Sequence, residues 1–188
     1  MRIKNWLIAA LLLVSPSLYA HTGGHAELSL MSGLLHPLTG IDHLLVLLAV
    51  GLIGAKQGGK AMFAFPAVFF ALMAVGALLN AVAVQIPFVE SLIALSLVAF
   101  GLLSSISQKQ RSKMFFLGVS FFAVFHGYAH AAEIPADSSA ALYFSSLMLM
   151  SLVICVGGCV IGLTTGKRIN YLFSLVCLSS GVYYLAAG

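Results

Sequence analysis

Six long apolar runs, separated by short polar connections, are the feature that most constrains how this chain can fold. They cover residues 28–55, 62–84, 88–106, 114–134, 139–163 and 169–187. Each is close to the roughly 20 residues that a helix needs to cross the hydrocarbon core of a bilayer. Hydrophobic residues make up 61% of the chain and charged residues only 7%, a balance that soluble domains do not show. We therefore expect an all-α integral membrane protein with six transmembrane helices.

The residues before the first of these runs are expected to form a separate segment. Two basic residues precede an apolar stretch from Trp6 to Val14, and the sequence SPSLYA then leads to His21. A basic start, a short apolar core and an end rich in small residues are typical of a secretory signal peptide. We expect cleavage after residue 20, which leaves residues 21–188 as one transmembrane domain. An uncleaved signal anchor is the alternative.

The positions of the charged residues indicate how the chain crosses the membrane. All nine Lys and Arg lie in the first four residues or in the first, third and fifth connections between the apolar runs, whereas Glu90, Glu133 and Asp137 lie in or beside the second and fourth. Because basic loops remain on the cytoplasmic side, we expect a multi-pass protein of the bacterial cytoplasmic (inner) membrane with both mature termini on the outer, periplasmic side. The basic residues do not form the soluble basic face that nucleic-acid binding requires.

Three titratable side chains interrupt the first apolar run. The sequence HPLTGIDH places His36, Asp42 and His43 among apolar residues. Ionisable groups at membrane depth are costly, so they are candidates for a functional site. On a regular helix the two histidines would share one face and Asp42 would point about 120° away. Pro37 cannot donate a backbone hydrogen bond and predicts a kink or an opened turn beside His36.

A second group of titratable residues lies in the fourth apolar run, in the sequence FHGYAHAAE. His126 and His130 are four residues apart and therefore neighbours on one helix face, and Glu133 follows at the next turn. At about 1.5 Å per residue, the two groups overlap in depth below the outer surface. We expect a funnel of ligands that leads from the outer mouth toward the centre of the bilayer.

Imidazole and carboxylate ligands together suit nickel, cobalt, zinc or copper and disfavour magnesium and calcium. A carboxylate can bind the ion or orient a histidine through its second nitrogen, and both roles are open to Asp42. The predicted metal ligands are His36, Asp42, His43, His126, His130 and Glu133. The alternatives are that a membrane histidine only bonds a neighbouring helix and that Glu133 is merely solvated beside its loop.

Two sequence motifs carry a family resemblance. HPLTGIDH, followed by AVG at residues 49–51, and FHGYAHAAEIP at residues 125–135 resemble the two signatures of the HupE/UreJ family of nickel permeases. The resemblance covers essentially the whole chain. It implies uptake of nickel, with cobalt as a second candidate ion, across the cytoplasmic membrane for hydrogenase or urease maturation, and it implies that the six residues above act in transport. One departure is Ala131, where the family motif has a glycine.

Several further residues have two open interpretations. His21 and His25 could capture metal near the mature N-terminus or belong to a flexible linker. Cys155 and Cys159 could offer thiolates to a metal, but the glycines interleaved with them favour close helix packing. Because two groups of three helices would cross the membrane in opposite senses, a 3+3 inverted arrangement is a further hypothesis.

Function at this level has three candidates. The leading one is a non-enzymatic secondary transporter with Ni²⁺ as cargo and no prosthetic group. Its expected partners are the ion and the lipid bilayer, and assembly into a homo-oligomer is an open alternative. The chain has no nucleotide-binding P-loop motif. The second is an intramembrane zinc hydrolase, which would need a general base near an open metal position. The third is a non-transporting membrane scaffold for metalloenzyme assembly.

Overall fold

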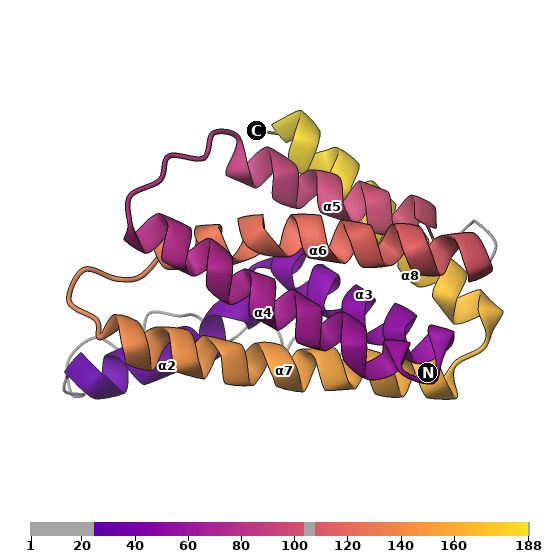
Figure 1. The fold of residues 1–188 in the computed structure, drawn as a ribbon, viewed down its shortest axis with the longest axis horizontal. Coiled ribbons are helices and arrows are strands. Elements are labelled where there is room, and N and C mark those ends of the chain that lie inside the picture. Colours follow the sequence, from indigo (N-terminus) through magenta and orange to yellow (C-terminus); the bar gives the residue numbers. More distant parts are fainter. Residues whose placement is uncertain (1–24, 104–107, 188) are drawn as a thin grey trace, which may run out of the picture.

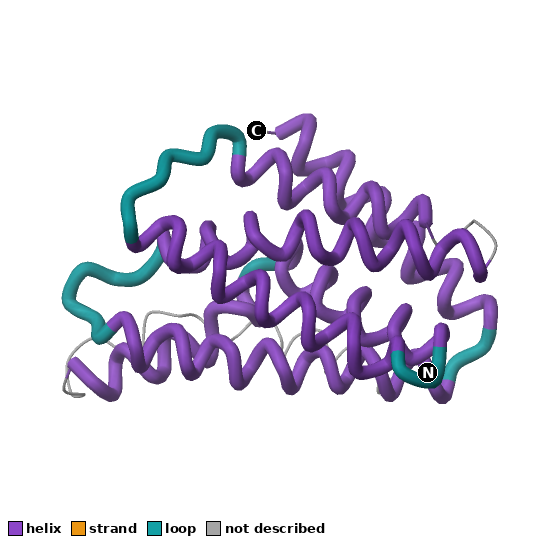
Figure 2. The backbone as a smooth tube through the Cα atoms, in the orientation of Figure 1, coloured by secondary structure: helices purple, strands orange, loops and turns teal. Residues whose placement is uncertain are grey.

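The computed structural model of the chain describes residues 25–103 and 108–187. These residues form seven α-helices, shown in Figures 1 and 2, and the all-α prediction is confirmed for this part of the chain. The helices are α2 (His25–Thr39), α3 (Ile41–Gln57), α4 (Ala61–Ala81), α5 (Val89–Leu103), α6 (Gln108–Ala132), α7 (Ala140–Thr164) and α8 (Lys167–Ala187). The expected signal peptide and His21 lie outside the described residues.

Four of the described helices are long and apolar enough to cross a membrane: α4, α7, α8 and the part of α6 from Lys113 to Ala132. A fifth span results if α2 and α3 are counted together, since they pass the same test as a bent pair. The remaining helix, α5, is apolar but has 15 residues, which corresponds to about 22 Å. The protein is thus a multi-pass membrane protein with four or five candidate spans among the described residues, and the described part of each predicted apolar run is mainly helical.

Glycines bring the helices together in pairs. Gly51 and Gly158 lie in the contact between α3 and α7, and Gly76 and Gly127 lie in the contact between α4 and α6. A Cβ atom at any of these four positions would collide with a backbone carbonyl of the facing helix. Small residues allow this close approach in membranes, where helices gain little from excluding lipid and depend on tight packing. The packing interpretation of the glycines beside Cys155 therefore holds.

Two hydrogen bonds show the direction of α7 relative to α2 and α3. At one end, the backbone N–H of Ser139 before α7 donates to Ser29 Oγ of α2 at 2.8 Å. At the other end, Lys56 Nζ of α3 donates to the carbonyl of Thr165 after α7. α7 therefore runs parallel to α2 and α3, as Figure 1 shows for α2 and α7. The acidic connection before α7 and the basic connection after it consequently lie at opposite ends of the molecule.

Candidate metal site

The first apolar run is broken at Gly40, where the chain bends by 78° between α2 and α3. Gly40 has an extended backbone, with φ −84° and ψ 105°, and Thr39 Oγ1 donates to the carbonyl of His36 at 2.9 Å where α2 ends. The predicted kink is thus present, but it lies three residues beyond Pro37, which remains inside α2. The positions expected from a straight helix are accordingly wrong for this segment.

The bend brings together side chains that a straight helix would hold apart. A straight helix separates residues seven positions apart by about 10 Å along its axis. In the structure the ring centroids of His36 and His43 are 6.1 Å apart. His36 ends one helix and His43 begins the next, so both imidazoles reach the same side of the break, where α6 lies.

Four imidazoles form a continuous row across this junction, which we call the imidazole file: His36, His130, His43 and His126, in that order. Consecutive ring centroids are 4.9, 4.4 and 5.3 Å apart. The histidines come alternately from the broken segment and from α6. The side chain of His36 is 23% exposed, whereas the other three histidines are buried. The file therefore leads from a partly exposed end into the interior.

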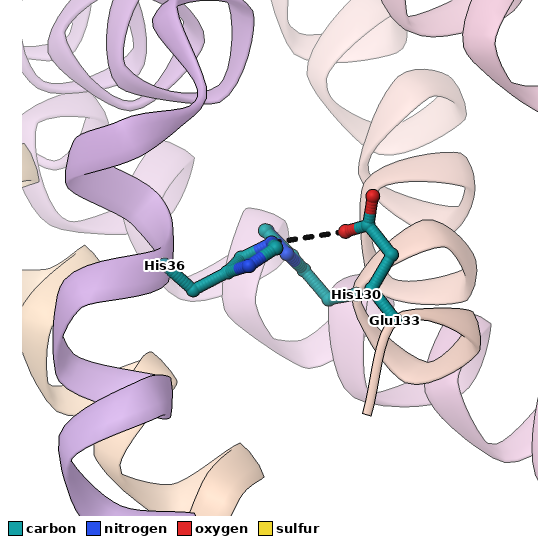
Figure 3. A group of neighbouring side chains, drawn as sticks. All are labelled: His36, His130 and Glu133. Carbon is teal, nitrogen blue, oxygen red and sulfur yellow. Dashed lines mark ion pairs between the residues drawn. The ribbon is translucent and has the colours of Figure 1, made fainter. Parts of the chain in front are cut away.

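A carboxylate lies at the exposed end of the file. Glu133 directly follows α6, and its Oε2 is 3.0 Å from His36 Nε2 (Figure 3). One potential ligand atom each from His36, His130 and Glu133 lies within 4.8 Å of the other two. This outer cluster has the size and the atom types that a divalent ion requires.

At the buried end, hydrogen bonds fix which nitrogen of each imidazole is free. Asp42 Oδ1 accepts from both the backbone N–H and the Nδ1 of His43, each at 2.8 Å. The Nδ1 of His126 donates to the carbonyl of Phe122 at 2.9 Å. Carboxylate and carbonyl oxygens can only accept, so both Nδ1 atoms carry hydrogen and both Nε2 atoms of the neutral rings carry a lone pair. Asp42 thus takes the orienting position that often supports a metal-binding histidine.

These lone pairs have no partner in the described part of the chain. The Nε2 atoms of His43 and His126 and the Nδ1 of His130 are buried without a hydrogen bond to any described residue. A buried polar atom left unpaired is destabilising by about 1–3 kcal/mol. Three such atoms on neighbouring rings form a donor set that a divalent ion with a preference for imidazole would satisfy.

All six residues predicted from the sequence lie in or beside the imidazole file. Asp42, expected from helix geometry to point about 120° away from the histidines, turns its carboxylate onto the ring of the neighbouring His43, which fits the orienting role that the sequence left open for it. The close helix contact in the second motif falls at Gly127, and Ala131 is half-buried. His25 is the first residue of α2.

Two aromatic residues border the file that sequence reasoning did not single out. The ring of Phe69 on α4 lies 5.7 Å from that of His126, and the ring of Tyr143 on α7 lies 5.9 Å from that of His36. Both residues are fully buried. In a chain this rich in aromatic residues, their sequence context is the same as that of a packing residue, so no signal distinguished them.

Comparisons with known proteins agree with the motifs. The family described as HupE / UreJ protein matches residues 9–187. Protein HupE of Rhizobium leguminosarum bv. viciae is 37% identical over 151 residues, which cover 80% of this chain and 78% of that protein. No solved structure matches the chain. A family match over nearly the whole length, together with this relative, shows that the chain belongs to the HupE/UreJ family.

Proposed function

We propose that the protein is a secondary permease that takes up Ni²⁺, with Co²⁺ as a second cargo, across the cytoplasmic membrane for hydrogenase or urease maturation. The HupE/UreJ family is associated with nickel uptake for these enzymes. The observation that carries the proposal is the set of three buried, unpaired imidazole nitrogens on His43, His126 and His130. In this proposal α5 and the bent α2–α3 pair each count as a span, which gives the six spans expected from the sequence.

The imidazole file supports a stepwise mechanism. A hydrated ion first meets Glu133 and His36 at the exposed end, where the carboxylate offsets its charge. It then loses water as it passes to the nitrogen of His130, which belongs to both the outer cluster and the file. His43 and His126 supply the next ligands, and their tautomers are already fixed, so little reorganisation is needed. Entry into a negative interior is favourable by about 4.6 kcal/mol per 100 mV for two charges.

Radiolabelled nickel uptake by cells that express the chain tests this proposal directly. We compare wild type with His36→Ala, His43→Ala and His126→Ala at matched membrane protein levels, and we add cobalt and zinc as competitors. Wild type is expected to accumulate nickel, and each substitution is expected to abolish accumulation because it interrupts the file. Tyr171→Ala, at an exposed residue of α8, serves as the control. Absence of nickel accumulation by wild type, or normal transport by the variants, contradicts the proposal.

A further inference from the structure

Tyr143, whose ring borders the imidazole file at His36, combines burial with an unpaired hydroxyl. Its residue is 1% exposed, and its hydroxyl has no hydrogen-bond partner among the described residues. Buried tyrosines usually find a partner for this group, because an unpaired buried hydroxyl destabilises the folded state. The ring meets that of His36 edge-on at 5.9 Å, with an interplanar angle of 62°. A group with these properties at this place needs an explanation beyond packing.

The contact between α2 and α7 holds Tyr143 in position. Gly33, one turn before His36, presses against the backbone carbonyl of Tyr143, so that a side chain at Gly33 would collide with it. The hydrogen bond between Ser139 and Ser29 fixes the start of α7 one turn earlier. The tyrosine is therefore placed by its backbone, and its hydroxyl takes no part in holding the helices together.

We propose that the Tyr143 hydroxyl is an outer-shell partner of the transported ion, a role that rests on the permease function proposed above. A neutral phenol is a poor direct ligand, but it can accept a hydrogen bond from water bound to a divalent cation. Near His36 it can hold such a water while the ion exchanges its hydration shell for imidazole nitrogens. In the ion-free site this hydroxyl then has no partner, as is also the case for the unpaired nitrogens of the file.

Tyr143→Phe removes only the hydroxyl and keeps the buried ring. Outer-shell partners contribute about 10–100-fold to metal affinity, so we expect Ni²⁺ titrated into the purified full chain in detergent to bind about tenfold more weakly. The apparent KM of nickel uptake is expected to rise by the same factor. Because the hydroxyl has no partner to lose, the thermal unfolding midpoint of the metal-free variant is expected to be unchanged or higher. Tyr171→Phe, on an exposed ring of α8, is the control.

The outcomes separate the two proposals. Equal nickel affinity in wild type and Tyr143→Phe overturns the role of the hydroxyl, as does a lower thermal midpoint, since the hydroxyl would then stabilise the fold. Nickel binding by wild type without uptake contradicts the permease but leaves the outer-shell role to be decided by the two affinities. Absence of both binding and uptake in wild type overturns both proposals.

Discussion

Asp42 is the carboxylate whose role the structure narrows most. One of its oxygens accepts two hydrogen bonds from His43, one from the backbone and one from the ring. The backbone bond fixes the carboxylate, and the ring bond orients the imidazole. A charged acceptor on Nδ1 also makes Nε2 a stronger donor to a metal. We therefore interpret Asp42 as a residue that acts on the ion through His43.

Asp42→Asn tests whether the charge of Asp42 matters in addition to its hydrogen bond to His43. An amide oxygen can still accept a hydrogen bond at the same place, but it carries no charge, so His43 becomes a weaker ligand. We expect the apparent KM of nickel uptake to rise by about 10–100-fold, with transport retained at high nickel. The concentration dependence of uptake measures this effect. Asp137→Asn, in the connection before α7, is the control, and an unchanged KM for Asp42→Asn contradicts the orienting role.

The residues of the candidate site could be named from the sequence because their chemistry is rare in an apolar chain. Histidine, aspartate and glutamate inside spans stand out against lipid-compatible neighbours, so both motifs identified their candidates without a structure. Tyr143 did not stand out, because a tyrosine satisfies the same apolar pattern as a phenylalanine. The role proposed for it rests on a hydroxyl without a hydrogen-bond partner among the described residues, and this is a property of the packed structure alone.

Close helix crossings are the feature that matters most at the level of elements. The file needs the broken segment and α6 at a fixed separation, and both are held by partners packed at glycines. Gly158 of α7 lies against the backbone carbonyl of Leu48 in α3. At its neighbour Gly157, a Cβ atom would meet no atom of another described helix within 4 Å. The two glycines therefore provide a matched pair on one helix.

We expect Gly158→Ala to lower stability and Gly157→Ala to leave it unchanged or higher. The added methyl group at position 158 must push α7 away from α3, and overpacking of this kind is destabilising by about 1–3 kcal/mol. At position 157 the methyl group finds open space, and alanine is the better helix former. Thermal unfolding of the purified variants in detergent measures the difference. Equal midpoints would mean that the α3–α7 crossing is looser than the structure indicates.

The break between α2 and α3 was predicted from the sequence in part: its presence was expected, but its position and size were not. Proline predicted a disturbance in the right segment, but the helix continues past Pro37 to Thr39, and the break lies at Gly40. The position of the break could not be predicted from the sequence, because it depends on how α2 and α3 pack against α6 and α7. Because the bend is this large, the rings of His36 and His43 both lie beside that of His130. No local sequence pattern predicts the size of the bend.

At the scale of the whole molecule, the helix pairs have a regular arrangement. The first span packs with the fifth, the second with the fourth, and the third with the sixth, if α2 and α3 count as the first. Exchanging the two halves of the chain reproduces the same three pairs. This pairing supports the hypothesis of an inverted 3+3 arrangement. Each half of the chain then contains one of the two sequence motifs that supply the imidazole file.

The separation of charge between the two ends leads to a prediction about orientation. If the end with the basic connections faces the cytoplasm, the exposed end of the file opens to the outside, which is the sense required for uptake. Asp137→Cys is then expected to react with a charged, membrane-impermeant maleimide in spheroplasts, and Lys60→Cys only in inside-out vesicles. Wild type, whose three cysteines lie within helices, gives the background. The reverse labelling would place the mouth of the file on the cytoplasmic side, and the protein would then be built to export the ion.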